Sequence, residues 1–228
     1  MKHVVTGAGS GIGRALVQRL AARGDDLVLL ARSDARAAGL SSTFPDAQVL
    51  VADLADPGTL NGLGRQVDGP VHSLVHVAGV IELGRVDRLR LADWDEQLAV
   101  NLTAPAVLTR ELLPHVRAGH GTVVFVNSSA GLTASAEWSA YAASKSGLRA
   151  FADALREEEA EHGVRVTTIY PGRTATPMQQ KVHAQEGRDY DASRWATAET
   201  VAGTILHVVD LPADATIPDV RIRPGPGT

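Results

Sequence analysis

Short apolar runs rich in β-branched residues recur along the 228-residue chain, and longer segments with helical periodicity separate them. Runs of this length and composition are typical of strands that are buried on both faces of a sheet. We expect strands at residues 3–6, 26–31, 48–52, 72–77, 122–127, 164–170 and 216–221. Because strands and helices alternate, the pattern predicts an α/β fold with a doubly wound parallel sheet of about seven strands, helices on both faces and ligands at the carboxyl ends of the strands.

The predicted helices have recognisable ends. Gly24 and Gly163 are placed to end helices, Asp93 with Glu96 fits a capping box, and residues 56–57 (Asp-Pro) fit an N-cap followed by Pro at the first helical position. The only segment dense in Pro and Gly is the tail at residues 224–228, so no linker divides the chain. We therefore expect residues 1–228 to form a single domain.

A formal net charge of −4 and the absence of Cys exclude several classes of function. Without a broad positive surface, no nucleic acid partner is expected. Without Cys there can be no disulfide framework, thiolate zinc site or Cys nucleophile. No apolar run approaches the roughly 18 residues that a membrane helix needs, and no secretory apolar segment precedes the first glycines. We therefore expect a soluble, cytoplasmic protein with no membrane partner.

A glycine-rich turn, residues 6–13 (Thr-Gly-Ala-Gly-Ser-Gly-Ile-Gly), follows the first predicted strand and opens the first predicted helix. Glycine permits positive φ and close backbone approach, and a helix N-terminus offers free N–H groups to a phosphate. A plain tight turn would explain the glycines alone, but their place between strand and helix predicts a dinucleotide site. Its expected contacts are Gly7, Ser10, Gly11, Ile12 and Gly13. The turn lacks the Gly-Lys-Ser/Thr ending of a P-loop, which disfavours hydrolysis of nucleoside triphosphates.

The end of the second predicted strand bears on the choice of cofactor. Folds of this kind that prefer NAD usually place an acid there for the adenosine ribose, whereas this chain has Ala31 followed by Arg32. A guanidinium can bind a 2′-phosphate through paired hydrogen bonds, so Arg32 favours NADP(H) while NAD(H) stays open. The alternative is that Arg32 is a solvated strand end. Asp53 and Leu54, after the third predicted strand, are expected near the adenine, and a helix N-cap is the other explanation for Asp53.

Tyr141 and Lys145 lie four residues apart at the start of a predicted helix, so their side chains share one face. A phenol with a pKa near 10 is a poor base at neutral pH, and a nearby cation lowers that pKa. Such pairs occur on many helices by chance. The pair gains meaning only from the other motifs of the chain.

Those motifs occur in a fixed order: the glycine-rich turn, residues 126–129 (Val-Asn-Ser-Ser), residues 141–145 (Tyr-Ala-Ala-Ser-Lys) and residues 170–172 (Tyr-Pro-Gly). In this order they resemble the short-chain dehydrogenase/reductase family, in its compact branch with a single Rossmann domain. The resemblance covers nearly the whole chain. It implies an NAD(P)-dependent enzyme that interconverts carbonyl and alcohol groups by hydride transfer.

The resemblance also implies a role for each catalytic residue. Tyr141 would be the general acid and base, Lys145 would bind the nicotinamide ribose and lower the pKa of Tyr141, and Ser128 would orient the substrate oxygen. Asn101 would hold a relay water near Lys145, although a helical Asn can also simply bond to backbone. Ser128 lies thirteen residues before Tyr141, which matches the family spacing and places Gly131 where the family has Gly, and Ser129 is the alternative.

Further cofactor contacts follow from the same resemblance: Ala78, Gly79, Pro171, Gly172, Thr174 and Thr176. The chain departs from the family at His76 and Val77, where the family usually has two Asn residues that brace the central strands. His72 and His76 are four residues apart on a predicted strand, but no third ligand is in view. We therefore expect no metal site.

Residues 177–195 are polar and irregular and stand where the family keeps its substrate lid, and an inert surface loop is the alternative. Met178, Gln179, Gln180 and Trp195 lie in this segment. Trp138 could form a wall of the substrate pocket, or it could pack at an interface.

The sequence thus predicts an NADP(H)-dependent oxidoreductase that acts on a small carbonyl or alcohol compound. A 3-oxoacyl thioester, a sugar, a steroid and a small ketone all remain open as substrates. The resemblance implies a homo-oligomer, a tetramer or dimer, assembled through the helices that carry Asn101 and Tyr141. The alternatives are a catalytically silent NAD(P)-binding sensor, which would not need Ser128, Tyr141 and Lys145, and a nucleotide-sugar epimerase or dehydratase, whose additional C-terminal domain this chain lacks.

Overall fold

The computed structural model describes residues 1–225 and contains a seven-stranded parallel sheet. The strand order is β3-β2-β1-β4-β5-β6-β9, so the order reverses between β1 and β4. The strands are β1 (Lys2–Thr6), β2 (Asp26–Ala31), β3 (Gln48–Val51), β4 (Ser73–His76), β5 (Thr122–Val126), β6 (Arg165–Pro171) and β9 (Asp219–Ile222). All seven lie within the predicted segments or within a residue of them, which confirms the predicted fold class. Residues 226–228, at the end of the predicted tail, lie outside the described part.

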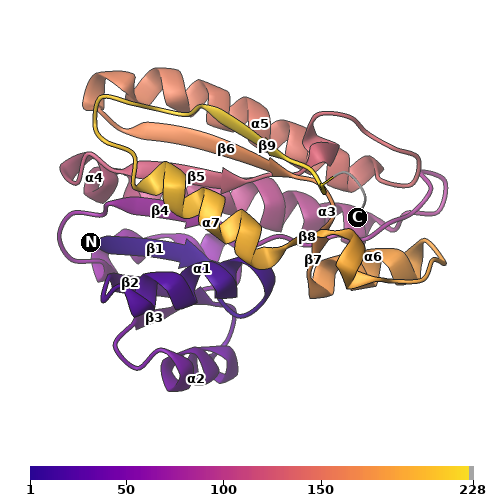
Figure 1. The fold of residues 1–228 in the computed structure, drawn as a ribbon, viewed down its shortest axis with the longest axis horizontal. Coiled ribbons are helices and arrows are strands. Elements are labelled where there is room, and N and C mark those ends of the chain that lie inside the picture. The colour runs from indigo at the N-terminus through magenta and orange to yellow at the C-terminus, as the bar shows by residue number, and fades with distance from the viewer. Residues whose placement is uncertain (226–228) are drawn as a thin grey trace.

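Helices cover both faces of this sheet (Figure 1). The helices α1 (Gly11–Ala22), α2 (Asp34–Thr43) and α7 (Ala198–Val209) lie on one face, and α3 (Leu91–Leu98), α4 (Ala104–Ala118) and α5 (Ser139–Glu159) lie on the other. Short helical turns fill the connections: η1 (Pro57–Leu60), η2 (Leu63–Gln66), η3 (Ala99–Thr103), η4 (Ser129–Gly131), η5 (Ala160–His162) and η6 (Ala192–Arg194). None of the helices within residues 1–225 is long and apolar enough to cross a membrane.

Each face of the sheet has its own hydrophobic core, because alternate strand residues point to opposite sides. Val4 and Val123 are fully buried against α4 and α5, and Val5 and Val124 are fully buried against α1 and α7. Burial of one such side chain contributes about 1.5 to 3 kcal/mol. This two-sided burial explains why the strands are almost continuously apolar in sequence.

Two local expectations are corrected. The capping box is wrong, because α3 begins at Leu91 with Arg90 at its N-cap, and Asp93 lies inside the helix and accepts a hydrogen bond from Arg90 Nε at 2.7 Å. The segment at residues 177–195 is also more regular than expected: it contains α6 (Pro177–Gln185) and η6. A small parallel sheet of β7 (Thr174–Ala175) and β8 (Ala196–Thr197) closes the base of this segment.

Other predicted helix ends are confirmed. Gly24 and Gly163 follow helical turns with φ values of +73° and +68°, in the left-handed region that favours glycine. Asp56 caps η1 by accepting a hydrogen bond from the Gly58 amide at 3.1 Å, with Pro57 at the first position. These short-range signals depend only on neighbouring residues, so they are readable from sequence.

Candidate active site

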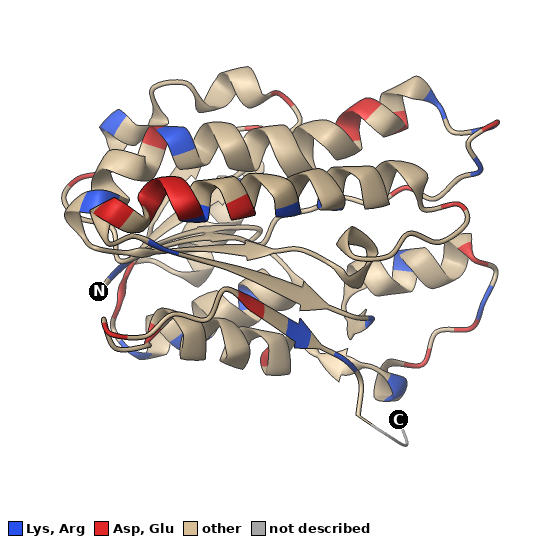
Figure 2. Ribbon diagram, turned by 90° about the horizontal axis from the view of Figure 1, so that it is seen from above, with Lys and Arg blue, Asp and Glu red and all other residues tan. Residues whose placement is uncertain are grey.

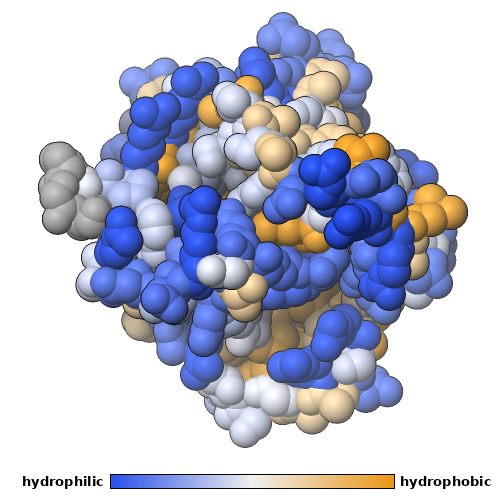
Figure 3. Space-filling model, turned by 90° about the vertical axis from the view of Figure 1, so that its right-hand side faces the viewer, coloured by the Kyte–Doolittle hydropathy of each residue, from blue (hydrophilic) through white to orange (hydrophobic). Residues whose placement is uncertain are grey.

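A cleft of about 720 Å³ lies at the carboxyl edge of the sheet, and its walls come from the loops that follow β1 to β6 together with α6. Figure 3 views the molecule from this side and shows apolar surface in hollows between hydrophilic side chains. Basic and acidic residues are interspersed over the ribbon in Figure 2, so no face in that view carries one sign of charge. The cleft is therefore the concave feature that most resembles a ligand site.

The glycine-rich turn forms the floor of the cleft between β1 and α1. Gly7 has a φ of +75°, and a Cβ there would lie 2.8 Å from the Ala78 amide nitrogen, so only glycine fits. The backbone at Gly9 faces open space, and the Ser10 side chain makes no capping bond to α1. The first turn of α1 therefore presents unsatisfied N–H groups toward the cleft, as an anion site requires.

Gly13 packs against the glycine-rich turn. It does not line the cleft, and a Cβ at this position would lie 2.2 Å from the Gly7 carbonyl oxygen. Its small size allows α1 to pack closely against the turn. Gly13 thus shapes the site, whereas Gly7, Ser10, Gly11 and Ile12 line it.

The missing Asn pair is replaced by other braces. Thr6 Oγ1 accepts hydrogen bonds from the amides of Val77 and Ala78, each at 3.1 Å, and so ties β1 to the turn after β4. The His76 ring stacks on Phe125 at a centroid distance of 4.9 Å, and its Nε2 lies 2.9 Å from Thr109 Oγ1. Burial lowers the pKa of His76 to about 3, so the ring is neutral. No group of three or more His, Asp or Glu residues within residues 1–225 is arranged to hold a metal ion.

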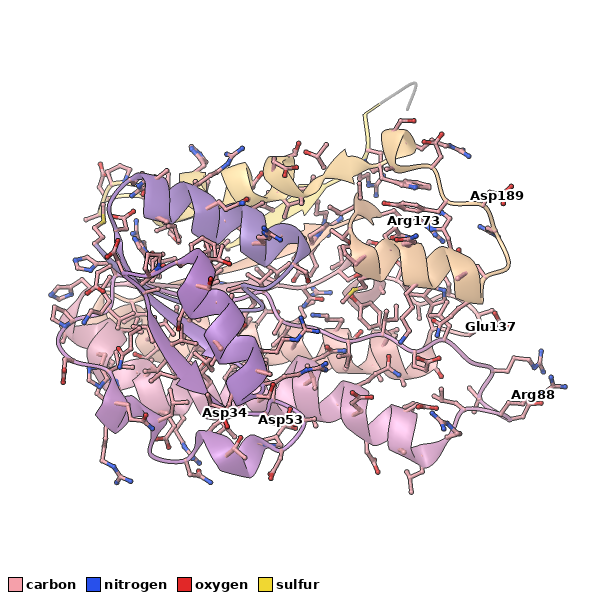
Figure 4. The ribbon with its side chains drawn as sticks, turned by 90° about the horizontal axis from the view of Figure 1, so that it is seen from below. Asp34, Asp53, Arg88, Glu137, Arg173 and Asp189 are labelled. Atoms are coloured by element: carbon pink, nitrogen blue, oxygen red, sulfur yellow. The ribbon has the colours of Figure 1, made fainter. Side chains whose placement is uncertain are left out.

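The far end of the cleft is lined by Arg32, Asp53 and Leu54, as the sequence predicts, and also by Arg36. Asp34 begins α2 after β2 and does not line the cleft, although it lies only two residues from Arg32. Figure 4 labels Asp34 and Asp53 on the segments that follow β2 and β3. Asp53 Oδ1 accepts a hydrogen bond from the Ala55 amide at 3.0 Å, but Asp53 is not a helix N-cap, because Asp56 caps the following turn η1. Sequence reasoning missed Arg36, whose position one helical turn after Arg32 was the available signal.

Tyr141 and Ser128 lie together at the opposite end of the cleft. Tyr141, in the first turn of α5, is 6 % exposed, and Ser128 lies between β5 and η4. Burial raises the pKa of Tyr141 to about 12, and a hydrogen bond with the Ser128 side chain acts in the opposite direction. Ser129 also lines the cleft. The hydrogen bond that lowers the phenol's pKa comes from Ser128, which favours Ser128 over Ser129 as the partner of the phenol.

Lys145 lies one turn further along α5. Its ammonium nitrogen is 5.9 Å from the centroid of the Tyr141 ring, and it donates a hydrogen bond to the Val126 carbonyl at 3.0 Å. Burial lowers the pKa of Lys145 to about 8. In the free protein burial dominates the pKa of Tyr141, and the Lys145 ammonium is bonded to a backbone carbonyl.

Asn101 is fully buried in a π-helical turn, η3, between α3 and α4. Its side-chain amide donates to the Val80 carbonyl at 2.9 Å and to Ser144 Oγ at 3.0 Å, and its oxygen accepts from the Val80 amide at 2.9 Å. These bonds match the alternative considered for this residue, a side chain bonded to backbone. A Cβ on Gly79 would lie 3.2 Å from Asn101 Oδ1 and 3.7 Å from Lys145 Nζ, so the three residues meet at one point.

The space beyond Tyr141 is walled by a small apolar cluster. Ile81, Ala130, Val182 and Met178 pack around Tyr141 together with Trp138, whose ring meets the phenol edge to face at 5.9 Å. Thr176 caps α6 by accepting a hydrogen bond from the Gln179 amide at 3.3 Å, and its methyl group packs against Gly11. The helix α6 therefore lies directly over the cleft.

Polar bonds tie α6 to the loop after β4. Lys181 Nζ donates to Glu82 at 2.7 Å and to the Ile81 carbonyl at 2.9 Å, and Gln185 bonds both Glu82 and the Leu83 amide. Of the residues expected here, Met178 and Gln179 line the cleft, whereas Gln180 is exposed and Trp195 does not line it. Pro171, Gly172, Thr174, Thr176, Ala78 and Gly79 all line the cleft.

Comparison with known proteins identifies the fold and its chemistry. The short chain dehydrogenase family matches residues 2–187. This chain belongs to that family. A Mycobacterium tuberculosis protein assigned as the oxidoreductase SadH is 36% identical over 199 residues, which cover 82% of this chain and 71% of that protein. The chain is accordingly an oxidoreductase that acts on alcohol or carbonyl groups.

Solved structures of this family are similar over nearly the whole chain. A Beutenbergia cavernae protein assigned as an NAD(P) dependent gluconate 5-dehydrogenase, with NADP bound at low occupancy, is 30% identical with a TM-score of 0.84, covering 96% of this chain and 94% of that one. A serine dehydrogenase in complex with NADP⁺ has a TM-score of 0.87 at 22% identity and covers 98% of this chain and 95% of its own, which shows a shared fold. This dehydrogenase thus has the architecture in which such cofactors bind.

Proposed function

We propose that this dehydrogenase catalyses reversible carbonyl reduction and alcohol oxidation with NADP(H), and that Ser128, Tyr141, Lys145 and Asn101 form its catalytic centre. The observation that carries the proposal is the Tyr141 phenol, which faces the cleft, bonds to Ser128 and has Lys145 one helical turn away. A regulatory module that only bound a dinucleotide would need none of these three groups at the reacting end.

The residues of the cleft fit a nicotinamide dinucleotide. The free N–H groups of the first turn of α1 suit a pyrophosphate, and the open backbone at Gly9 leaves room for it. Asp53 and Leu54 line the end at which an adenine would lie, and Thr174, Thr176 and Gly79 line the end near Tyr141. When bound, NADPH supplies the hydride that reduces the carbonyl carbon.

The protein's own residues would move the accompanying proton. With a pKa raised to about 12, Tyr141 keeps its proton at neutral pH and can donate it to the carbonyl oxygen as charge develops there. Ser128 donates a second hydrogen bond to the same oxygen. The buried Lys145 ammonium stabilises the phenolate left behind, and Asn101 ties the loop after β4 to α5 beside it. A relay water between Asn101 and Lys145 belongs to this proposal.

Arg32 supports NADP(H) over NAD(H), and the structure adds Arg36 from the first turn of α2. Two guanidinium groups at the same end of the cleft suit a 2′-phosphate. We expect Arg32→Asp to weaken NADPH binding by about 10 to 100-fold and to leave NADH binding nearly unchanged. Titration of the free protein with each cofactor tests this, and equal weakening of both would contradict the choice of NADP(H).

The function itself is tested by following NADPH absorbance with a panel of ketones, aldehydes and alcohols, and by repeating the panel with NADH. We expect turnover of at least one carbonyl compound with NADPH and slower turnover with NADH. Tight NADPH binding with no turnover of any carbonyl or alcohol would instead indicate the silent, cofactor-binding alternative.

The same proposal includes assembly and organisation. We expect a cytoplasmic homo-oligomer, a dimer or tetramer, in which residues 1–228 form one NAD(P)-binding domain and residues 177–195 act as the substrate lid. The exposed face of α5 carries the small side chains of Ala143, Ser146 and Ala150, which permit close helix packing. Light scattering on the purified protein measures the assembly, and a monomer at micromolar concentration would contradict it.

A further inference from the structure

The substrate end of the cleft contains a charged pair that the proposed chemistry does not use. Arg173, in the turn between β6 and β7, lines the cleft and donates to Glu186 through both terminal nitrogens, at 2.9 and 2.7 Å. Glu186 follows α6 directly, and its side chain is 12 % exposed. The Arg173 hydrogen bonds hold the pKa of Glu186 below its usual value, so the pair is ionised.

Two indole rings enclose this pair. The Arg173 guanidinium carbon is 5.9 Å from the centroid of the Trp138 ring and 5.6 Å from that of the Trp195 ring. Trp138 in turn lies 5.9 Å from the Tyr141 ring, so one aromatic ring separates the reacting phenol from the guanidinium. In Figure 4 Arg173 lies inside the outline of the molecule beside α6, whereas Arg88 projects outward.

A cation at this place would ordinarily recruit an anionic substrate, but Glu186 prevents this. Both terminal nitrogens of the guanidinium are already bonded to Glu186, so its end-on fork is occupied and its charge is balanced before a substrate carboxylate arrives. It would also lose its hydration near the carboxylate of Glu186. The remaining wall is apolar and is formed by Ile81, Ala130 and Val182 with Met178 and Trp138.

We propose that Glu186 neutralises Arg173 and so sets the specificity of this enzyme for uncharged carbonyl or alcohol compounds with an apolar or aromatic substituent. This inference rests on the proposed function, and it narrows the substrate class of the same site. Trp138 provides the face against which the substituent packs. Glu186 is a specificity-determining residue that acts through Arg173 and touches no reacting atom.

The experiment compares benzoylpropionate with its methyl ester, two ketones that differ at one end in charge and in one methyl group. With the NADPH-loaded wild-type enzyme, we expect kcat/KM for the ester to exceed that for the acid by about tenfold or more. Glu186→Gln keeps a hydrogen-bond acceptor for Arg173 but removes the charge. It should therefore lower the ratio of kcat/KM for the ester to kcat/KM for the acid by about tenfold, mainly because KM for the acid falls. The double variant Arg173→Gln with Glu186→Gln should restore the ester preference.

Glu82→Gln is the matched control, because Glu82 also ties α6 to the rest of the protein but does not line the cleft. An equal change of the ratio in this control would show that Glu186→Gln merely loosens α6, and the inference would be wrong. It would also be wrong if the wild-type enzyme used the acid as well as the ester.

Binding gives a second readout that does not depend on turnover. Trp138 and Trp195 are two of the three tryptophans of the chain, so their fluorescence reports a ligand at this end. Preferential quenching by the ester in the absence of turnover would support the specificity and contradict the catalytic proposal. Equal quenching by acid and ester, or quenching by neither at millimolar concentration, would overturn the inference.

Discussion

Each end of the sheet holds a group of largely buried polar side chains that includes a serine, but only one of the two groups borders a cleft. At the amino end, His3 Nδ1 lies 2.7 Å from Ser73 Oγ, and His3 Nε2 lies 3.5 Å from Asp25 Oδ2. At the carboxyl end, Ser128, Tyr141 and Lys145 lie around the cleft. We call these the amino-end network (His3, Asp25, Ser73) and the carboxyl-end site (Ser128, Tyr141, Lys145).

The amino-end network has the atoms of a hydrolytic triad, but it has no access to a substrate. Ser73 and His3 are both 0 % exposed, and burial lowers the pKa of His3 to about 4. The carboxyl-end site is nearly as buried, yet its phenol faces a cleft. The comparison teaches that polar side chains can reach a substrate where the ends of parallel strands leave an opening, and can only support the fold where the chain covers them.

The largest expected effect separates the two ends directly. Tyr141→Phe should lower kcat by at least about 10² to 10⁴-fold, because it removes the proton donor, and should leave the Kd for NADPH within about twofold. Ser73→Ala should leave kcat within about twofold but destabilise the protein by roughly 1 to 3 kcal/mol, because the buried His3 loses its partner. Steady-state kinetics and urea unfolding measure both effects. A loss of turnover in Ser73→Ala would contradict the assignment of a purely structural role to the amino-end network.

Substitution of Lys145 should reveal that the carboxyl-end site lowers the stability of the folded protein. Its pKa falls from 10.5 to about 8 on burial, so keeping it charged at neutral pH costs the fold up to about 3 kcal/mol. Lys145→Met should therefore abolish turnover and raise the melting temperature by several degrees. Thermal unfolding at pH 7 measures this, and a lower melting temperature would show that the bond to the Val126 carbonyl outweighs the burial of charge.

The amino-end network should instead appear in the pH dependence of stability. The pKa of His3 is about 4 in the folded protein and 6.5 when unfolded, so below pH 6.5 the unfolded chain binds the proton first and acid favours unfolding. Between pH 6.5 and pH 5 the loss should be about 1.5 kcal/mol for His3, with a similar contribution from His76. Urea unfolding of His3→Gln should show a smaller slope with pH.

His207→Gln is the control for that slope, because His207 is exposed on α7. It should leave the pH dependence unchanged. Equal slopes in wild type and His3→Gln would contradict the neutral, buried state of His3.

The smallest expected effect concerns the residue that positions Trp138. Glu137 has a φ of +69°, a left-handed conformation that is costly for a residue with a Cβ, and its carbonyl accepts a hydrogen bond from the Gly84 amide at 2.8 Å. Glu137→Gly should change stability by less than about 1 kcal/mol, because relief of strain and greater freedom of the unfolded chain nearly cancel. A loss above about 2 kcal/mol in urea unfolding would show that the side chain itself is needed.

Local signals carried most of what the sequence predicted. The apolar runs located all seven strands, the glycine-rich turn located the floor of the cleft, and residues 141–145 located one of its ends. The sequence analysis did not predict the helix α6, because its exposed face is polar, although Thr176 followed by Pro177 is a readable helix start. The pairs Arg173–Glu186 and His3–Ser73 join residues from different elements, and no local pattern in one sequence reports such contacts.

The most direct test of hydride transfer at the carboxyl-end site uses NADPH in which both hydrogens on C4 of the nicotinamide are replaced by deuterium. The wild-type enzyme is incubated with a ketone that it turns over, and the product alcohol is analysed by mass spectrometry. The account predicts one deuterium on the carbinol carbon of the wild-type product and about 10² to 10⁴-fold slower formation of that product by Tyr141→Phe. Product alcohol without deuterium, or formed by Tyr141→Phe at the wild-type rate, would contradict it.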